Sequence, residues 1–295
     1  MTVKDFRDMI DKQIITNRPK LSVSSLKTYC SCLFNIYKHT HKEDDEMNLD
    51  FFNDETKFED YLKNKTSVSR KTSLSALFVL TGKNEYREQM LEDCKAVNND
   101  YLQQTKTQKQ TDNWATVQEI RDVYDKLYTD VKLMFSKKAV MQPNIVISYL
   151  LVALLGGVMC PPRRSLEYSL MKIRNYSPTD NYYKAGKFYF NKYKTSSKYG
   201  LQTMEVPKDI DVIIKKWIKI NNTDFLLFSN NEKMVSSSQI TRILNKCFGK
   251  NISTDMLRHI YLSNLYKDVP ALTQMENTAN EMGHSLTTAL QYVKK

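Results

Sequence analysis

The apolar positions of this chain recur mostly with a helical period. In residues 22–41, Leu26, Cys30, Leu33 and Tyr37 follow one another at spacings of three and four, behind serines that can cap a helix. The same period predicts further helices over residues 56–65, 67–82, 84–104, 117–136, 143–156, 209–221, 236–248, 253–266 and 271–283. With only 7 Gly and 7 Pro, this pattern indicates a mainly α protein.

One segment has a different period. In residues 182–207, Tyr, Phe and Val alternate with polar residues, and turn residues interrupt them at 184–187 and 195–200. This pattern predicts a small antiparallel β-sheet, the only one we expect in the chain. Residues 41–55 are rich in acidic side chains and are expected to form a loop.

Residues 105–114, TKTQKQTDNW, have almost no apolar content and are typical of an interdomain linker. Just beyond them, Thr116 and Glu119 have the spacing of a capping box that begins a helix. We therefore expect a helical domain over residues 1–105, a linker over 106–113, and a second, mixed α/β domain over 114–295.

The positive charge is concentrated in the second part of the chain. Residues 1–112 carry 18 Lys/Arg and 18 Asp/Glu, whereas residues 113–295 carry 26 and 15, so the entire net charge of +11 lies there. Such a basic half suits a polyanion, most often nucleic acid. A solubilising basic surface is the alternative.

Several protein classes are disfavoured. The longest apolar stretch, residues 145–159, contains a serine and two glycines, which indicates a buried helix rather than a membrane span. The first residues are charged from Lys4 onward, unlike a secretory signal. Five cysteines without paired metal spacing suggest reduced thiols in the cytoplasm or nucleus of a host cell. Nucleotide-binding glycine motifs are missing, so no cofactor is expected.

Four short motifs contain side chains that can carry chemistry. In PPRRSLEYSLMKI, Arg164 and Glu167 are three residues apart and share a helix face, as a surface ion pair or as an arginine directed at a phosphate. In NKYKTSSKYG, Lys194 and Lys198 flank a hairpin tip, where lysines are often only solubilising.

The other two motifs lie near the end of the sequence. In DMLRHIYLSNLY, the apolar stripe of Leu257, Tyr261 and Leu265 leaves Arg258 on another face, beside His259. The final stretch, MGHSLTTALQYVKK, contains His284 and Tyr292.

Taken together and in this order, the motifs resemble the tyrosine recombinase (phage integrase) family, whose catalytic order is Arg, Lys, His-x-x-Arg, His or Trp, then Tyr. The resemblance covers the whole chain and implies a two-domain C-shaped clamp, with a helical core-binding domain and a catalytic domain. It implies that the catalytic residues are Arg164, Lys194, Arg258, His284 and Tyr292.

This sequence departs from the family pattern in three ways. Asp255 occupies the first position of the His-x-x-Arg motif, where an aspartate is a poorer proton acceptor than histidine near neutral pH. His259 or His284 could take over that role, or Asp255 could orient a neighbour. The interval from His284 to Tyr292 is one residue shorter than usual. The C-terminal helix with which family members dock onto a neighbour is also missing, so assembly is expected to use other surfaces or to form only on DNA.

The resemblance implies site-specific cutting and rejoining of double-stranded DNA through a 3′-phosphotyrosine, without metal or ATP, by a dimer to tetramer assembled on DNA. The expected DNA contacts are Lys27, Arg70, Lys71, Lys106, Lys109, Arg163, Lys198, Arg242 and His259. A type IB topoisomerase and a non-catalytic DNA-binding relative are the alternatives. Abundant Lys, Asn, Ile and Tyr suggest AT-rich codons, consistent with a viral or mobile-element origin.

Overall fold

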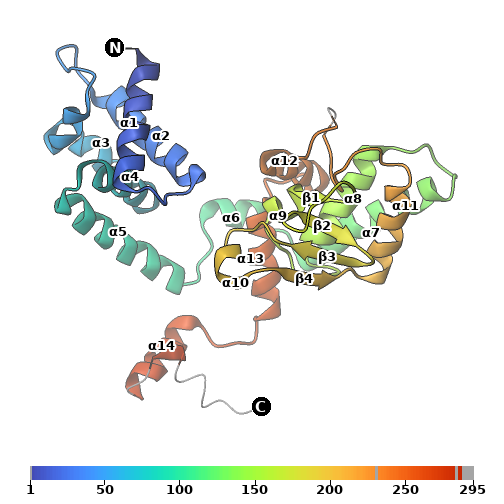
Figure 1. Cartoon of the computed structure of the whole chain (residues 1–295). Coiled ribbons are helices and arrows are strands. Elements are labelled where there is room, and N and C mark those ends of the chain that lie inside the picture. Colours follow the sequence, from blue (N-terminus) through green and yellow to red (C-terminus); the bar gives the residue numbers. More distant parts are fainter. Residues whose placement is uncertain (1, 230–231, 283–284, 288–295) are drawn as a thin grey trace. The chain divides into compact units, whose positions relative to one another are not determined.

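The computed structural model describes residues 2–229, 232–282 and 285–287. The chain forms two compact units, one of Met1–Thr105 with Pro270–Lys295 and one of Lys106–Val269 (Figure 1). Each unit has its own apolar core. No helix within the described ranges is long and apolar enough to cross a membrane.

The first unit is helical. Its elements are α1 (Val3–Asn17), α2 (Val23–Thr40), the 3-10 turns η1 (Leu49–Asn53) and η2 (Glu55–Lys57), α3 (Glu59–Lys63), α4 (Ser67–Thr81), α5 (Asn84–Leu102) and α14 (Leu272–Glu281). The predicted end of α4 is confirmed, because Gly82 caps it with a φ of 74°, a conformation that glycine adopts without strain.

The acidic segment of residues 41–55 is more than a loop. It contains η1, whose Phe51 and Phe52 are buried in the core of the first unit. The Tyr86 hydroxyl on α5 donates a hydrogen bond to the Phe52 carbonyl at 3.0 Å. Because charged residues surround Phe51 and Phe52, the period of apolar positions did not predict that these two side chains are buried.

The second unit contains eight helices in its described residues. They are α6 (Gln108–Asn113), α7 (Val117–Phe135), α8 (Pro143–Leu155), α9 (Ser165–Ser169), α10 (Ser196–Tyr199), α11 (Lys208–Ile218), α12 (Ser237–Phe248) and α13 (Thr254–Leu265). Helix α8 is buried on nearly every side, as its apolar sequence predicts, and α7, α11 and α12 pack against it. The capping box of Thr116 and Glu119 is confirmed at the start of α7.

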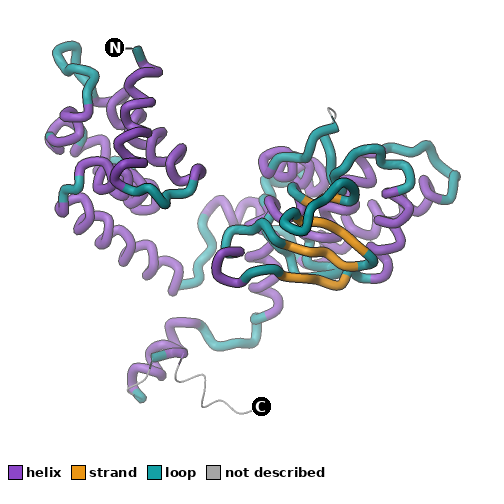
Figure 2. The backbone as a smooth tube through the Cα atoms, in the orientation of Figure 1, coloured by secondary structure: helices purple, strands orange, loops and turns teal. Residues whose placement is uncertain are grey.

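A four-stranded sheet lies in the same unit, in the order β1-β2-β3-β4 (Figure 2). Strands β2 (Asn181–Lys184), β3 (Lys187–Phe190) and β4 (Gln202–Glu205) are antiparallel, as predicted. The structure adds the short β1 (Met171–Lys172), which pairs with β2 in parallel. Ala185 and Gly186 both have positive φ, which gives the tight β2–β3 turn the twist that a hairpin requires. The longer connection from β3 to β4 contains α10.

The polar segment before α7 is partly helical. Residues 108–113 form α6, a helix that the sequence pattern did not predict, and Thr107 caps it through a capping box with Gln110. The Asn113 side chain accepts a hydrogen bond from the Asn251 backbone at 2.8 Å. The end of this segment is therefore fixed to the second unit.

Candidate active site

Arg164 lies at the N-cap of α9, where the backbone turns from a loop into a helix. Its side chain is 42% exposed, and its Nη1 lies 4.0 Å from Oε1 of Glu167. The Glu167 side chain is only 3% exposed. Arg164 thus lies at the outer limit of an ion pair with a buried carboxylate, and its side chain is partly open to solvent.

Arg163 has a different environment, although it is the adjacent residue. Its Nε donates to Oε2 of Glu167, and its Nη2 donates to Oε1 of Gln202 on β4 at 2.8 Å. Its Cζ lies 4.1 Å from the ring centroid of Phe190, which is within cation–π range. Arg163 was predicted to contact DNA, but its donors are directed at protein groups.

Lys194 lies in the connection between β3 and β4, immediately after the buried Tyr193. The Tyr193 hydroxyl donates to the Gly200 carbonyl at 2.7 Å and so closes the loop that carries the lysine. Lys194 itself is exposed, and its amine has no hydrogen-bond or ion-pair partner among the residues that the structure describes. Its backbone is thus held while its side chain is free to meet a ligand.

Arg258 lies in the first turns of α13, with a side chain 31% exposed. Its Nη1 lies 3.4 Å from Oδ1 of Asp255, and Nε2 of His259 lies 3.4 Å from Oδ2 of the same carboxylate. Asp255 therefore lies between two cationic or potentially cationic side chains. This geometry agrees with an orienting role.

The predicted apolar stripe of α13 is only partly buried. Leu257 is fully buried, whereas Leu265 is exposed. The packed part of α13 is the part that holds Arg258.

Gly157 lies directly against α13, the helix that carries Arg258. It follows α8, on the path to Arg164, and has a φ of 76°. A Cβ at this position would come within 2.6 Å of Cδ2 of Tyr261, three residues beyond Arg258 on the same helix. The absence of a side chain on Gly157 allows the loop to lie directly against α13.

Two of the five predicted catalytic residues, His284 and Tyr292, lie outside the described residues. The structure thus describes Arg164, Lys194 and Arg258, all in the second unit. Among the described residues, no group of three or more His, Cys, Asp or Glu side chains could hold a metal ion.

The predicted DNA-contacting residues have varied surroundings. Lys27, Lys109, Lys198, Arg242 and His259 are exposed. Lys106 is also exposed, but its Nζ lies 4.0 Å from the ring centroid of Trp114. Arg70 forms two hydrogen bonds, of 2.8 and 2.6 Å, with the buried carboxylate of Asp93. Lys71, beside it on α4, is half-buried.

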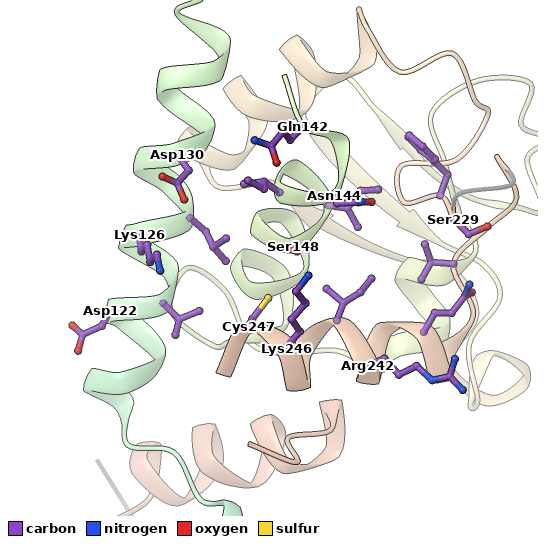
Figure 3. Close-up of a pocket in the computed structure, with 18 residues that line it drawn as sticks. Asp122, Lys126, Asp130, Gln142, Asn144, Ser148, Ser229, Arg242, Lys246 and Cys247 are labelled. Atoms are coloured by element: carbon purple, nitrogen blue, oxygen red, sulfur yellow. The ribbon is translucent and has the colours of Figure 1, made fainter. Parts of the chain in front are cut away.

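A groove of about 940 Å³ opens between α7, α8 and α12 (Figure 3). Lys126 on α7 and Lys246 on α12 are among its charged lining residues, together with Arg242. Arg164, Lys194 and Arg258 do not line it. The sequence did not predict this groove, because the residues that line it come from three helices and a loop and form no sequence motif.

No family model and no curated protein matches the sequence. Among solved structures, the chain is similar to a lambda integrase (75-356) dimer bound to a COC′ core site, with 13% identity, 92% of each chain covered and a TM-score of 0.49. It is also similar to XerA recombinase, with 12% identity, 100% of this chain and 94% of that chain covered, and a TM-score of 0.36.

A third similar structure is a lambda integrase tetramer bound to a Holliday junction, with 15% identity and a TM-score of 0.46. That match covers 92% of this chain and 74% of the other. Since these TM-scores lie below 0.5, we derive the proposed function from the side chains of this chain.

Proposed function

We propose that the protein is a site-specific DNA strand transferase that cuts and rejoins duplex DNA through a phosphotyrosine. The observation that carries the proposal is that Arg164 follows a loop that packs, at Gly157, against Tyr261 of α13, the helix that also carries Arg258. Both guanidinium groups are partly exposed, and a carboxylate lies within 4.0 Å of each. The basic character of residues 113–295 supplies the attraction for a polyanion.

The two arginines suit the pentacoordinate transition state of a phosphodiester. Negative charge grows on the non-bridging oxygens as the nucleophile attacks, and a guanidinium offers planar, bidentate donors that stay charged. Donors that are already oriented need no reorganisation during the reaction. A carboxylate lies near each guanidinium, Glu167 at 4.0 Å from Arg164 and Asp255 at 3.4 Å from Arg258, and we assign these two carboxylates the role of orienting the donors.

We assign the covalent step to Tyr292, Lys194 and His284. The phenol oxygen of Tyr292 attacks phosphorus, the bond from phosphorus to the 5′ oxygen breaks, and a 3′-phosphotyrosine forms. Lys194 gives its proton to the departing 5′ oxygen. His284 accepts the phenol proton or hydrogen-bonds the phosphate. In the second step, a 5′ hydroxyl attacks the phosphotyrosine, releasing Tyr292 and resealing the strand without an external energy source.

Recombination requires two duplexes to be held together, so we propose that two to four copies assemble on DNA. Lys27, Lys109, Lys198 and Arg242 are the exposed cations that we assign to the backbone of the duplex. Binding through several phosphates releases counterions, so the affinity should fall steeply as salt rises.

A suicide substrate tests the proposal. A duplex from the protein's own genome, nicked so that the short 5′ product strand is lost after cleavage, should accumulate a covalent protein–DNA adduct on a denaturing gel. Transfer of the trapped strand to a second duplex indicates a recombinase, whereas relaxation of supercoils without transfer indicates a topoisomerase. DNA binding with no adduct on any candidate end would favour a non-catalytic relative and reject the proposal.

A further inference from the structure

Arg163 contacts two parts of the proposed site, one that binds the phosphate and one that protonates the leaving group. One part is Arg164, which binds the phosphate, and the other is the loop that carries Lys194. Glu167 provides the first link, because Oε2 receives Arg163 while Oε1 faces Arg164. One buried carboxylate therefore binds Arg163 directly and also lies within 4.0 Å of Arg164.

The second link runs from Arg163 to the Lys194 loop. On the entry side of the loop, where β3 ends, the Arg163 guanidinium lies 4.1 Å from the ring centroid of Phe190 and 5.7 Å from that of Tyr193. On the exit side, where β4 begins, the guanidinium donates a hydrogen bond to Gln202 at 2.8 Å. Because Lys194 directly follows Tyr193, a single side chain holds both ends of the loop that presents the lysine.

Asn181 strengthens the entry side of this arrangement. It is fully buried, and its Nδ2 donates to the Glu167 carbonyl at 3.0 Å and to the Lys192 carbonyl at 2.9 Å. The exit side has no comparable buried side-chain link to α9 within the described residues. Phe190 and Gln202 are paired across β3 and β4, and Arg163 contacts both, so its guanidinium anchors the base of the Lys194 loop to the segment that carries Arg164.

We propose that Arg163 is a positioning residue that fixes the proton donor Lys194 relative to the phosphate-binding Arg164, and that it is not a DNA contact. Its exposed fraction of 23% and its three protein-directed interactions leave little of the guanidinium for a phosphate. This inference rests on the proposed function. A displacement of about 1 Å can cost about 100-fold in rate, so loss of the tether should slow cleavage without preventing DNA binding.

The test uses a leaving group that does not need an acid. In a matched suicide substrate, sulfur replaces the bridging 5′ oxygen at the cleaved phosphate. A thiolate leaves without protonation because a thiol, with a pKa of about 8.5, is a far stronger acid than an alcohol. Variants that impair only proton delivery should therefore recover on the sulfur substrate, whereas variants that impair phosphate binding should not.

We expect Arg163→Ala to cleave the oxygen substrate about 10-fold to 100-fold more slowly than the wild type, and the sulfur substrate within about 3-fold of it. Lys194→Ala should recover in the same way, and Arg164→Ala should stay slow on both substrates. Arg163→Lys, which keeps the charge but not the planar fork, should behave like Arg163→Ala in milder form. Gln202→Ala removes only the exit-side contact and is a second variant if Arg163→Ala does not fold.

The noncovalent affinity provides the second readout. Arg163→Ala should bind the duplex within about 2-fold of the wild type, with an unchanged salt slope, whereas loss of one phosphate contact should lower that slope by about one. Equal deficits of Arg163→Ala on both substrates, or a lowered salt slope, would overturn the positioning role alone. Failure of the wild-type protein to cleave either substrate would instead reject the proposed function, and the positioning role of Arg163 with it.

Discussion

Gly157 lies so close to Tyr261 that a Cβ on the glycine would come within 2.6 Å of the Cδ2 atom of the ring. Gly157 also has a φ of 76°, which L-residues with side chains rarely adopt. Gly157→Ala should therefore destabilise the protein by about 2–3 kcal/mol, the sum of backbone strain and overpacking, as measured by urea unfolding. It should also separate the segments that carry Arg164 and Arg258, and so lower the rate of adduct formation.

Gly249 offers a matched control. It has a φ of 62°, but nothing lies within 4 Å of where its Cβ would be. Gly249→Ala should cost only the backbone strain, about 1 kcal/mol, and leave the cleavage rate nearly unchanged. Equal effects at the two glycines would contradict the close approach of the loop to α13.

At Arg164 and at Arg258, removing the charge should slow adduct formation more than keeping the charge while removing the planar guanidinium. Alanine at Arg164 or Arg258 should lower the rate of covalent adduct formation by about 100-fold to 1,000-fold, since each removes an oriented donor to the transition state. Lysine at either position should recover only part of the rate, because an ammonium cannot make the bidentate contact. Single-turnover kinetics at saturating protein measure this, and full recovery by lysine would contradict the assigned role.

Asp180 should contribute an acid-sensitive part of the stability. Hydrogen bonding to Lys192, to the Ser177 backbone and to Lys172 holds the pKa of its carboxyl well below the ordinary 3.8. Since the folded pKa is depressed, the contribution is complete above about pH 4 and is lost as the pH falls through the folded value.

Asp180→Asn should accordingly lower the Tm by a few degrees at pH 7, and the difference from the wild type should shrink as the pH falls below 4. Scanning calorimetry from pH 7 to pH 2.5 measures both curves. A Tm difference that is constant over this range would show that the ion pairs with Lys172 and Lys192 do not stabilise the folded state.

Arg70 should prove structural. Its partner Asp93 has a side chain only 2% exposed, and the hydrogen bonds to Asp93 raise the pKa of Arg70. Arg70→Ala leaves that buried carboxylate unpaired and should cost about 2–3 kcal/mol in unfolding free energy. The exposed Lys27 is the contrast, since Lys27→Ala should leave stability within about 0.5 kcal/mol. The reverse ranking in a urea titration would restore Arg70 as a candidate DNA contact.

The strongly periodic elements could be predicted from the sequence. The capped start of α7, the Gly82 end of α4 and the β2–β3–β4 strands follow local rules of capping and alternation, and all are present. The burial of Phe51 and Phe52 could not be predicted, because charged residues surround them and long-range packing decides their state. Helix α6 has a capping box but no buried face, so the period of apolar residues did not indicate it.

The candidate site was only partly predictable for a related reason. The Arg-x-x-Glu spacing selects Arg164, and the structure leaves that guanidinium partly exposed. The pattern does not indicate that Arg163 packs on Phe190 or reaches Gln202, because these contacts join residues about 30 to 40 positions apart. Likewise, the sequence does not indicate that the carboxylate of Asp255 lies between Arg258 and His259, a placement that only the structure provides.

Mapping the covalent adduct tests the central claim most directly. Trypsin releases residues 268–294 as a peptide in which Tyr292 is the sole tyrosine, so mass spectrometry of a nuclease-trimmed adduct can identify the attachment residue. The account predicts a nucleotide 3′-phosphate linked to this peptide in the wild type, and no adduct with Tyr292→Phe although DNA still binds. Attachment at another residue, or an undiminished adduct in Tyr292→Phe, would contradict it.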